Sequence, residues 1–107
     1  MGTVVDLEDD TWRDQIAGDR PACIEFWGPW CTSCMLQRPI VDQIASLLGE
    51  RVGFFRVNVG TTRIDRELGV RTLPTVLVMK DGAEVARVTG DATRNDILVA
   101  LAGVLES

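Results

Sequence analysis

The chain has 107 residues, of which 46% are hydrophobic, a formal net charge of −5 and no histidine. This length fits one hydrophobic core, so we expect residues 1–107 to form a single domain. The acidic balance, with the arginines spread along the chain, argues against nucleic acid or an anionic membrane as the partner. The missing histidine excludes histidine-based acid–base catalysis and the commonest nitrogen ligand of metal ions.

The N-terminal segment and the cysteine count bear on the compartment. Residues 1–6 lack the basic and apolar regions of a secretory leader, and no apolar run approaches bilayer length. We therefore expect a cytoplasmic protein with no membrane partner. Three cysteines are too few for a secreted disulfide framework and cannot complete a four-sulfur metal site within one chain, so we expect no metal.

In chain order, the first predicted elements are a short strand within 3–7 and a helix over about 12–17. The helix is preceded by Thr11 in a pattern of capping-box form and stops at Gly18. Residues 22–27 are mostly apolar and of strand length, which is compatible with a central strand buried on both faces. Glu25 is the anomaly in this run.

A long amphipathic helix is predicted over 32–48, with Gly49 as its C-terminal cap. Pro39 lies inside this helix, where it removes one backbone hydrogen bond and should kink it. Residues 52–59 read as the next strand, so the two strands should be parallel and joined by a right-handed crossover. A capping pattern over 62–65 then predicts a short helix that is closed by a glycine.

The last part of the chain predicts a hairpin and a helix. Strands over 75–80 and 84–89 are separated by Asp81-Gly82, which indicates an antiparallel hairpin and therefore a mixed sheet. Thr93 has capping form and precedes an apolar stripe of helical spacing, so a final helix should pack on the sheet.

Two cysteines, Cys31 and Cys34, lie between the predicted strand over 22–27 and the long helix. If the helix begins at or just after Cys31, both sulfurs share one face and are within reach of a disulfide. The first sulfur then lies at the helix N-terminus, where unpaired amides and the macrodipole favour the thiolate that attacks disulfides. The alternative interpretation is a pair of small buried hydrophobic side chains.

The element order β, α, β, α, β, α, β, β, α resembles the thioredoxin family over essentially the whole chain. Four markers of that family are in register, namely its active-site segment (Trp27-Gly28-Pro29-Trp30-Cys31-x-x-Cys34), its helix-kinking proline (Pro39), its cis-proline loop (Leu73-Pro74-Thr75) and its last hairpin (Asp81-Gly82 with Thr89-Gly90). The resemblance implies the α/β thioredoxin fold, with a central mixed sheet of four to five strands flanked by helices on both faces.

The resemblance also implies roles for particular residues. Cys31 would be the attacking thiolate and Cys34 the resolving thiol, with their disulfide in place of any other cofactor. Glu25 falls where the family usually has a buried aspartate that exchanges a proton with the resolving thiol, and Arg56 would be its cation. The other interpretation of Glu25 is a satisfied buried ion pair or an exposed glutamate.

A docking surface for a partner chain is implied around Cys31, formed by Trp30, Leu73 and Thr89-Gly90. Pro74 would face Cys31 with a cis peptide bond and let neighbouring backbone groups pair with an extended substrate; otherwise it is an ordinary turn proline. We read Cys23 as a small buried hydrophobic residue, and expect Trp12 and Trp27 in the core.

The sequence departs from the family between the cysteines, where Thr32-Ser33 replaces the Gly-Pro of thioredoxin. Ser33 offers an amide and a hydroxyl that can hydrogen-bond the Cys31 thiolate and stabilise the reduced form. This predicts a redox potential less negative than the roughly −270 mV of thioredoxin. Met35 stands where the family often has lysine, which removes a cation and adds apolar surface.

The leading interpretation is a monomeric, cytoplasmic thiol–disulfide oxidoreductase that reduces protein disulfides and receives electrons from a thioredoxin reductase-type donor. A disulfide isomerase or oxidant is one alternative. Another is a module that binds a partner through the Trp30 and Pro74 surface without turnover. A metal or cluster held between two chains by two Cys-x-x-Cys pairs would instead predict a dimer.

Overall fold

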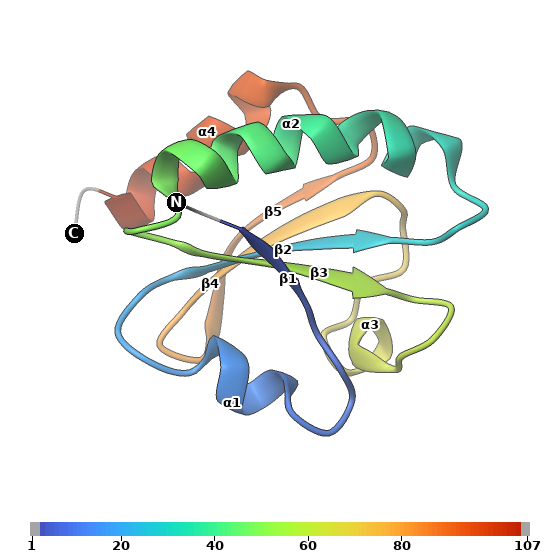
Figure 1. Ribbon diagram of the computed structural model, residues 1–107, viewed down its shortest axis with the longest axis horizontal. Coiled ribbons are helices and arrows are strands. Elements are labelled where there is room, and N and C mark those ends of the chain that lie inside the picture. The colour runs from blue at the N-terminus through green and yellow to red at the C-terminus, as the bar shows by residue number, and fades with distance from the viewer. Residues whose placement is uncertain (1–2, 106–107) are drawn as a thin grey trace.

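The computed structural model describes residues 3–105 and contains a five-stranded sheet with helices on both faces (Figure 1). The strands lie in the order β1 (Val4–Asp6), β3 (Gly53–Asn58), β2 (Ala22–Trp27), β4 (Thr75–Lys80) and β5 (Ala83–Thr89). β1 and β2 run parallel to β3, whereas β4 is antiparallel to β2 and to β5. The predicted mixed sheet and the parallel crossover from β2 to β3 are therefore confirmed.

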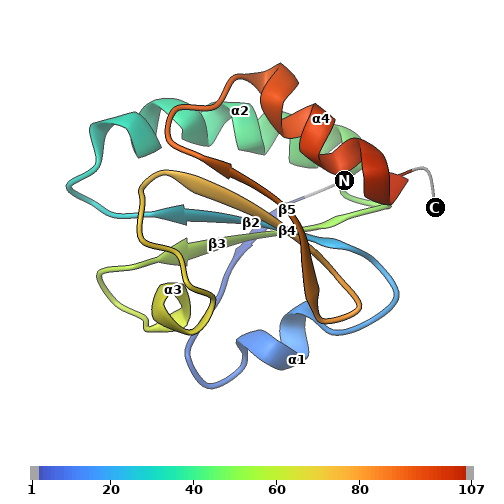
Figure 2. The ribbon, with the colours of Figure 1, turned by 180° about the vertical axis from the view of Figure 1, so that it is seen from behind.

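Two helices cover each face of the sheet. Figures 1 and 2 show α2 (Thr32–Leu48) and α4 (Arg94–Leu105) on one face, and α1 (Trp12–Ile16) and α3 (Ile64–Glu67) on the other. Among the described residues, no helix has the length and apolar character needed to cross a membrane.

Alternation of side chains along β2 builds two core layers, because successive residues of a strand point to opposite faces. Cys23 belongs to the layer under α2 and α4, together with Ile44 and Ile97. Ile24 and Phe26 belong to the layer under α1 and α3. Both faces of β2 are therefore buried, as its apolar run predicts for a central strand.

The end of β2 lies where three parts of the chain meet. Trp27 pairs with Asn58 at the end of β3, and Phe26 pairs with Thr75 at the start of β4. The segment after β2 leads into α2. The N-terminus of α2 and the loop before β4 therefore lie at the same end of the central strands, where β2 ends and β4 begins (Figure 1).

Several predicted boundaries differ by one residue. α1 ends at Ile16, β3 spans Gly53–Asn58, and β5 begins at Ala83. α2 has the predicted bounds, and Gly49 is its C-terminal cap as predicted, with a right-handed φ of −63° and its amide donating to the Ala45 carbonyl. The hairpin turn is confirmed, since Asp81 and Gly82 have φ of 53° and 79°, as a two-residue hairpin loop of this type requires.

Helix capping follows the sequence pattern at one helix and not at two others. Thr93 Oγ1 accepts from the Asp96 amide at 3.1 Å, and Asp96 Oδ2 accepts from the Thr93 amide at 2.9 Å, so the capping box before α4 is confirmed. The predicted caps at α1 and α3 are wrong. Thr11 lies in a backbone turn in which the Trp12 amide donates to the Glu8 carbonyl, and its hydroxyl contacts a side chain instead.

At α3, the Thr62 hydroxyl donates to the Asn58 carbonyl at 3.1 Å, so it is not a cap for the helix. A hydroxyl that has a nearer acceptor in the preceding loop satisfies that acceptor first, and the sequence pattern does not show this competition.

Candidate active site

Cys31 and Cys34 form a disulfide at the N-terminus of α2. Their Cα atoms are 5.3 Å apart, within the usual range for a bridged pair. Cys31 is the N-cap residue, with extended backbone, and its Sγ accepts a hydrogen bond from the Cys34 amide at 3.2 Å. The first sulfur therefore occupies the position where helix amides are unpaired, as the spacing predicts.

The two cysteines differ in exposure. Cys31 is half-buried, while Cys34 is 1% exposed. A macromolecular disulfide can therefore approach the Cys31 sulfur, whereas Cys34 is shielded beneath the first turn of α2.

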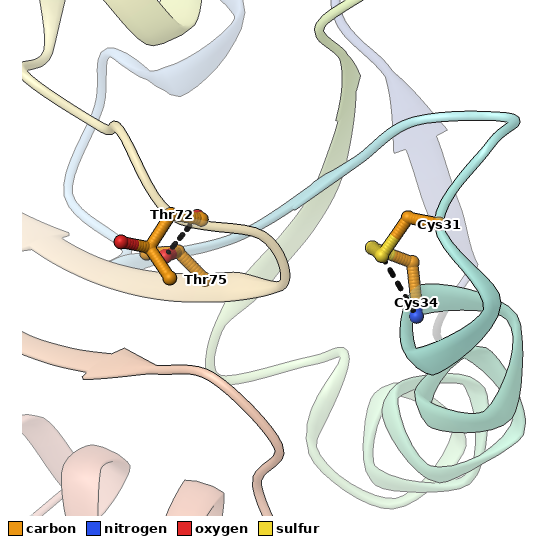
Figure 3. The surroundings of a disulfide bond; sticks show 4 residues. All are labelled: Cys31, Cys34, Thr72 and Thr75. Carbon is orange, nitrogen blue, oxygen red and sulfur yellow. Dashed lines mark hydrogen bonds between the residues drawn. A yellow bond between two sulfur atoms is a disulfide. The ribbon is translucent and has the colours of Figure 1, made fainter.

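The loop before β4 lies opposite the disulfide. Figure 3 shows the sulfur atoms on the side of α2 that faces the segment carrying Thr72 and Thr75. The Leu73–Pro74 peptide bond between those residues is cis, which confirms the expectation from the family resemblance. The Thr75 hydroxyl donates to the Thr72 carbonyl at 2.7 Å (Figure 3), and the Gly90 amide donates to the Pro74 carbonyl at 2.8 Å.

The bond from Gly90 joins the end of β5 to the cis-proline loop. Gly90 has φ of +78°, a conformation that glycine adopts without strain. Leu73 and Gly90 are half-buried and Thr89 is exposed, so this joined segment forms part of the surface on the disulfide side of the sheet.

Exposed apolar side chains lie close to the two cysteines in the chain. Trp30 is 66% exposed and Leu36 is 73% exposed, and Met35 is 38% exposed. The Trp30 ring lies against two glycines: a Cβ atom at Gly28 would be 2.7 Å from it and one at Gly60 would be 3.0 Å away. The glycines thus leave room for a ring that lies along the surface. Thr32 is exposed and Ser33 is half-buried beside it.

Glu25 lies in the layer between the sheet and α2, where it is 1% exposed. Arg56 Nε on the neighbouring strand donates to Glu25 Oε1 at 2.7 Å, and Arg56 Nη2 donates to Asp42 Oδ1 at 3.0 Å. Glu25 Oε2 is also buried and has no hydrogen-bond partner among the residues that the structure describes. The interpretation of Glu25 as an exposed glutamate is wrong, while its pairing with Arg56 is confirmed.

Burial raises the pKa of Glu25 above its ordinary value. The charges of Arg56 and Arg38 and the hydrogen bond from Arg56 act in the opposite direction, but the loss of hydration outweighs them. Cys23, two residues earlier on the same face of β2, is 1% exposed, and burial raises the pKa of its thiol to about 12. Cys23 is thus a small buried side chain, as predicted, and burial disfavours its thiolate form.

Two charged residues of this cluster, Asp42 and Arg38 on α2, are not among the residues that the sequence pattern indicates. Asp42 binds the second nitrogen of Arg56, and the Arg38 guanidinium carbon lies 4.3 Å from the centre of the Trp27 ring. The available signal was the spacing of Cys34, Arg38 and Asp42 at successive intervals of four residues, because residues four apart share a helix face. Trp27 is half-buried and belongs to neither core cluster, so the expectation that it lies in the core is wrong, whereas Trp12 is in the core as expected.

The remaining predicted residue on α2, Pro39, lies inside the helix on its exposed side. Among residues 3–105, no group of three or more histidine, cysteine, aspartate or glutamate side chains is placed to hold a metal ion.

A half-exposed cysteine at a helix N-terminus, disulfide-bonded to a buried second cysteine and facing a cis-proline loop on a mixed five-stranded sheet, defines a thiol–disulfide oxidoreductase of the thioredoxin fold. The family model described as Thioredoxin matches residues 3–102, and the chain belongs to the thioredoxin family.

Curated relatives and solved structures agree with this assignment. The chain is 30% identical to thioredoxin 1 of Synechococcus elongatus, over 84% of this chain and 86% of the relative. It is 31% identical to the chloroplastic thioredoxin M4 of Arabidopsis thaliana over 88% of its own length, but it spans only half of that longer protein.

Two crystal structures superpose closely. Thioredoxin of Malassezia sympodialis has a TM-score of 0.87 and 29% identity, covering 97% of this chain and 92% of the other. Thioredoxin f2, solved in complex with ferredoxin:thioredoxin reductase, has a TM-score of 0.87 at 24% identity, covering 99% and 97%. The second comparison supports the fold alone.

Proposed function

We propose that this protein reduces disulfides in other proteins, with Cys31 as the attacking group and Cys34 as the resolving group. The observation that carries the proposal is the difference in exposure between Cys31, at the helix N-terminus, and Cys34, which is 1% exposed. The Cys31 thiolate attacks one substrate sulfur, which forms a mixed disulfide and releases the first substrate thiolate. The Cys34 thiolate then attacks Cys31 Sγ, releases the second, and leaves the disulfide described above.

Glu25 is proposed as the acceptor of the proton that Cys34 loses. Its Oε2 is buried without a hydrogen-bond partner among the described residues, and burial raises the pKa of its carboxyl group. A carboxylate whose pKa is raised toward neutrality is a better base than one at its ordinary value. Arg56 supports this role, because its hydrogen bond at 2.7 Å fixes the other oxygen of Glu25. Pro39 is proposed to kink α2, because it has no amide hydrogen to donate within the helix.

Substrate polypeptides are proposed to dock on the surface that surrounds Cys31. Exposed apolar area next to a reactive group is typical of a site for a protein partner, and the side chain of Trp30 supplies much of it. A segment of the substrate would lie extended along the cis-proline loop. The residues assigned to this surface are Trp30, Thr32, Ser33, Leu73, Pro74, Thr89 and Gly90.

The electron donor is proposed to be a thioredoxin reductase-type enzyme that uses the same surface. The complex of thioredoxin f2 with ferredoxin:thioredoxin reductase shows that a protein of this fold binds such an enzyme. We further propose that residues 1–107 act as one domain, as a monomer and in the cytoplasm, with no cofactor other than the disulfide and with neither nucleic acid nor a membrane as partner.

The test of catalysis is the reduction of insulin by dithiothreitol, followed as precipitation of the released chains. The wild-type protein should accelerate precipitation and Cys31→Ser should not. Equal rates for the two proteins would overturn the catalytic proposal and leave a binding module as the better reading.

The direction of electron flow depends on the residues between the cysteines. Thr32 and Ser33 begin α2, and the Ser33 amide and hydroxyl are donors that Pro would not provide. We predict a redox potential less negative than about −270 mV, measured by equilibration against glutathione. The double variant Thr32→Gly/Ser33→Pro should move the potential to a more negative value. A wild-type potential at or below that of thioredoxin would contradict this reasoning, and a much higher one would favour an oxidant or isomerase.

A further inference from the structure

Cys34 shares a single stripe of α2 with two charged residues, Arg38 and Asp42, at intervals of four residues. Residues four apart on a helix lie one above the other, and helical side chains lean toward the N-terminus. By this rule, we expect the side chain at position 38 to lean toward the turn that carries Cys34. None of the roles proposed above for the disulfide exchange uses this arginine.

The position of the Arg38 guanidinium is fixed by the sheet below it. Its central carbon lies 4.3 Å from the centre of the Trp27 ring, in a cation–π contact. Trp27 and Glu25 are two residues apart on β2 and therefore point to the same face of the sheet, toward α2. Arg38 acts on this site electrostatically, since its charge is one of the causes that lower the pKa of Glu25 against the effect of burial.

Arg38 has a buried donor that is not used in the disulfide form. Its Nη2 atom is buried and makes no hydrogen bond with any described residue. The other cation of the cluster, Arg56, is hydrogen-bonded to both Glu25 and Asp42. A buried donor without a partner is destabilising, so its retention calls for an explanation.

The charged and titratable groups around the site can be named from each element. β2 contributes Glu25 and the Cys23 thiol, β3 contributes Arg56, and α2 contributes Arg38 and Asp42. Within the described core cluster, the same layer receives Val76 and Val78 from β4, Ala92 from the segment before α4, and Ile97, Leu101 and Val104 from α4. Arg38 is the cation of this set that has no hydrogen bond to a carboxylate.

We propose that Arg38 is a positioning residue for the resolving step, in which its guanidinium, held on Trp27, stabilises the negative charge that appears on Cys34. In the disulfide form Cys34 carries no charge, so the Arg38 Nη2 donor has no anionic partner there. After Cys31 has formed the mixed disulfide, the Cys34 thiol gives its proton to Glu25, the acceptor proposed above, and the Arg38 donor gains an anionic partner. Donors placed in advance where charge develops are an efficient means of catalysis. The inference rests on the proposed function, because it takes Cys34 as the resolving group.

The two steps can be separated with an uncharged dipyridyl disulfide as the probe. One equivalent is mixed with the fully reduced protein in a stopped-flow instrument. Attack by Cys31 releases the first pyridinethione, and attack by Cys34 on the mixed disulfide releases the second. The probe gains two electrons, the dithiol becomes the disulfide, and each pyridinethiolate takes up a proton from solution. An uncharged probe is used so that loss of an arginine does not change its encounter with the protein.

The variants are Arg38→Met, which keeps an apolar chain over Trp27, and Arg38→Lys, which keeps the charge. Arg66→Met is the matched control, because it removes one positive charge from an exposed residue of α3, on the opposite face of the sheet. Thermal unfolding of each variant is measured first. If Arg38→Met fails to fold, Arg38→Gln is measured in the same way.

Arg38→Met should slow the second release about tenfold at pH 7 and raise the midpoint of its pH profile by about one unit, which is the lower end of the effect of a nearby opposite charge. The first release should change less than twofold, and Arg38→Lys should recover most of the rate. Equal slowing of both releases, or an unchanged pH midpoint of the second, would overturn the inference.

Failure of the proposed function gives a different result from failure of this inference. If Cys34→Ser still releases both pyridinethiones, or the wild-type protein releases only one, the assigned order of the cysteines is wrong. If the wild-type protein releases both, Cys34→Ser releases one, and Arg38→Met behaves like Arg66→Met, only the role of Arg38 is wrong.

Discussion

Two glutamate–arginine pairs in this protein have the same chemistry and opposite surroundings. Glu25 and Arg56 bridge β2 and β3 at 2.7 Å, with side chains 1% and 9% exposed. Glu84 and Arg87 lie along β5 at 2.8 Å, with side chains 43% and 27% exposed. The pKa of Glu25 is raised because burial outweighs its partner, whereas the hydrogen bonds from Arg87 lower the pKa of Glu84.

The comparison shows that the environment, and not the partner, decides what an ion pair can do. A carboxyl group whose pKa is raised can exchange protons closer to neutral pH, and one whose pKa is lowered stays ionised there. Glu25 is therefore suited to proton transfer. Arg87 also donates to the carbonyls of Gly69 and Leu68 at 2.9 and 3.0 Å. These hydrogen bonds connect β5 to the segment after α3.

Among substitutions in the two pairs, Arg56→Met should cause the largest loss of unfolding free energy. The change leaves the Glu25 carboxyl buried without its cation and removes the partner of Asp42. Breaking a buried pair by removing one partner typically costs about 3–5 kcal/mol, and we expect a loss of unfolding free energy of that order in urea at pH 7.

The matched control for Arg56→Met is the double variant Glu25→Gln/Arg56→Met, which removes both charges. It should regain much of the lost unfolding free energy, because an uncompensated buried charge is the main source of the penalty. A loss below about 1 kcal/mol in the single variant would be the size seen for exposed pairs and would contradict the buried character assigned to Glu25.

The next effect is on the pH dependence of stability. Because the pKa of Glu25 is raised in the folded state, its contribution is fully present below the unfolded-state pKa and is lost as pH rises through the folded-state pKa. The unfolding free energy of the wild type relative to that of Glu25→Gln should therefore fall as pH rises above about 4.3. The fall should reach about 1.4 kcal/mol for each unit by which the pKa of Glu25 is raised in the folded state. Urea titrations of both proteins between pH 4 and pH 8 measure it.

The opposite change of relative stability with pH would contradict a raised pKa of Glu25. If the wild-type protein gains stability relative to Glu25→Gln over that pH range, the folded-state pKa of Glu25 is lowered, and the residue behaves like Glu84. Other titrating groups are common to the two proteins and cancel in the difference to a good approximation.

Much of the fold could be predicted because its signals are local. The apolar run of β2, the period of α2 and the positive-φ turn at Asp81-Gly82 each determine an element within a short window. Capping was less predictable. The same pattern of residues caps α4 at Thr93 but not α1 at Thr11, whose hydroxyl donates to the Gln15 side chain instead of accepting from a helix amide.

The site was predictable where it depends on one segment and less so where it depends on packing. The positions of Cys31 and Cys34 follow from their spacing at the start of a helix. The pair between Glu25 and Arg56 follows once β2 and β3 are neighbours in register. The contacts of Asp42 and Arg38 depend on how α2 is rotated over the sheet, which the sequence pattern alone leaves open.

The smallest effect is expected from Glu84→Gln. Its pair is solvent-exposed, so the change should lower the unfolding free energy by less than about 1 kcal/mol at moderate salt and by less still at high salt. Glu84 is substituted and not Arg87, since loss of the arginine would also remove two hydrogen bonds to backbone carbonyls. Rates of both pyridinethione releases should match those of the wild type. A loss as large as that of Arg56→Met would show that burial is not what separates the two pairs.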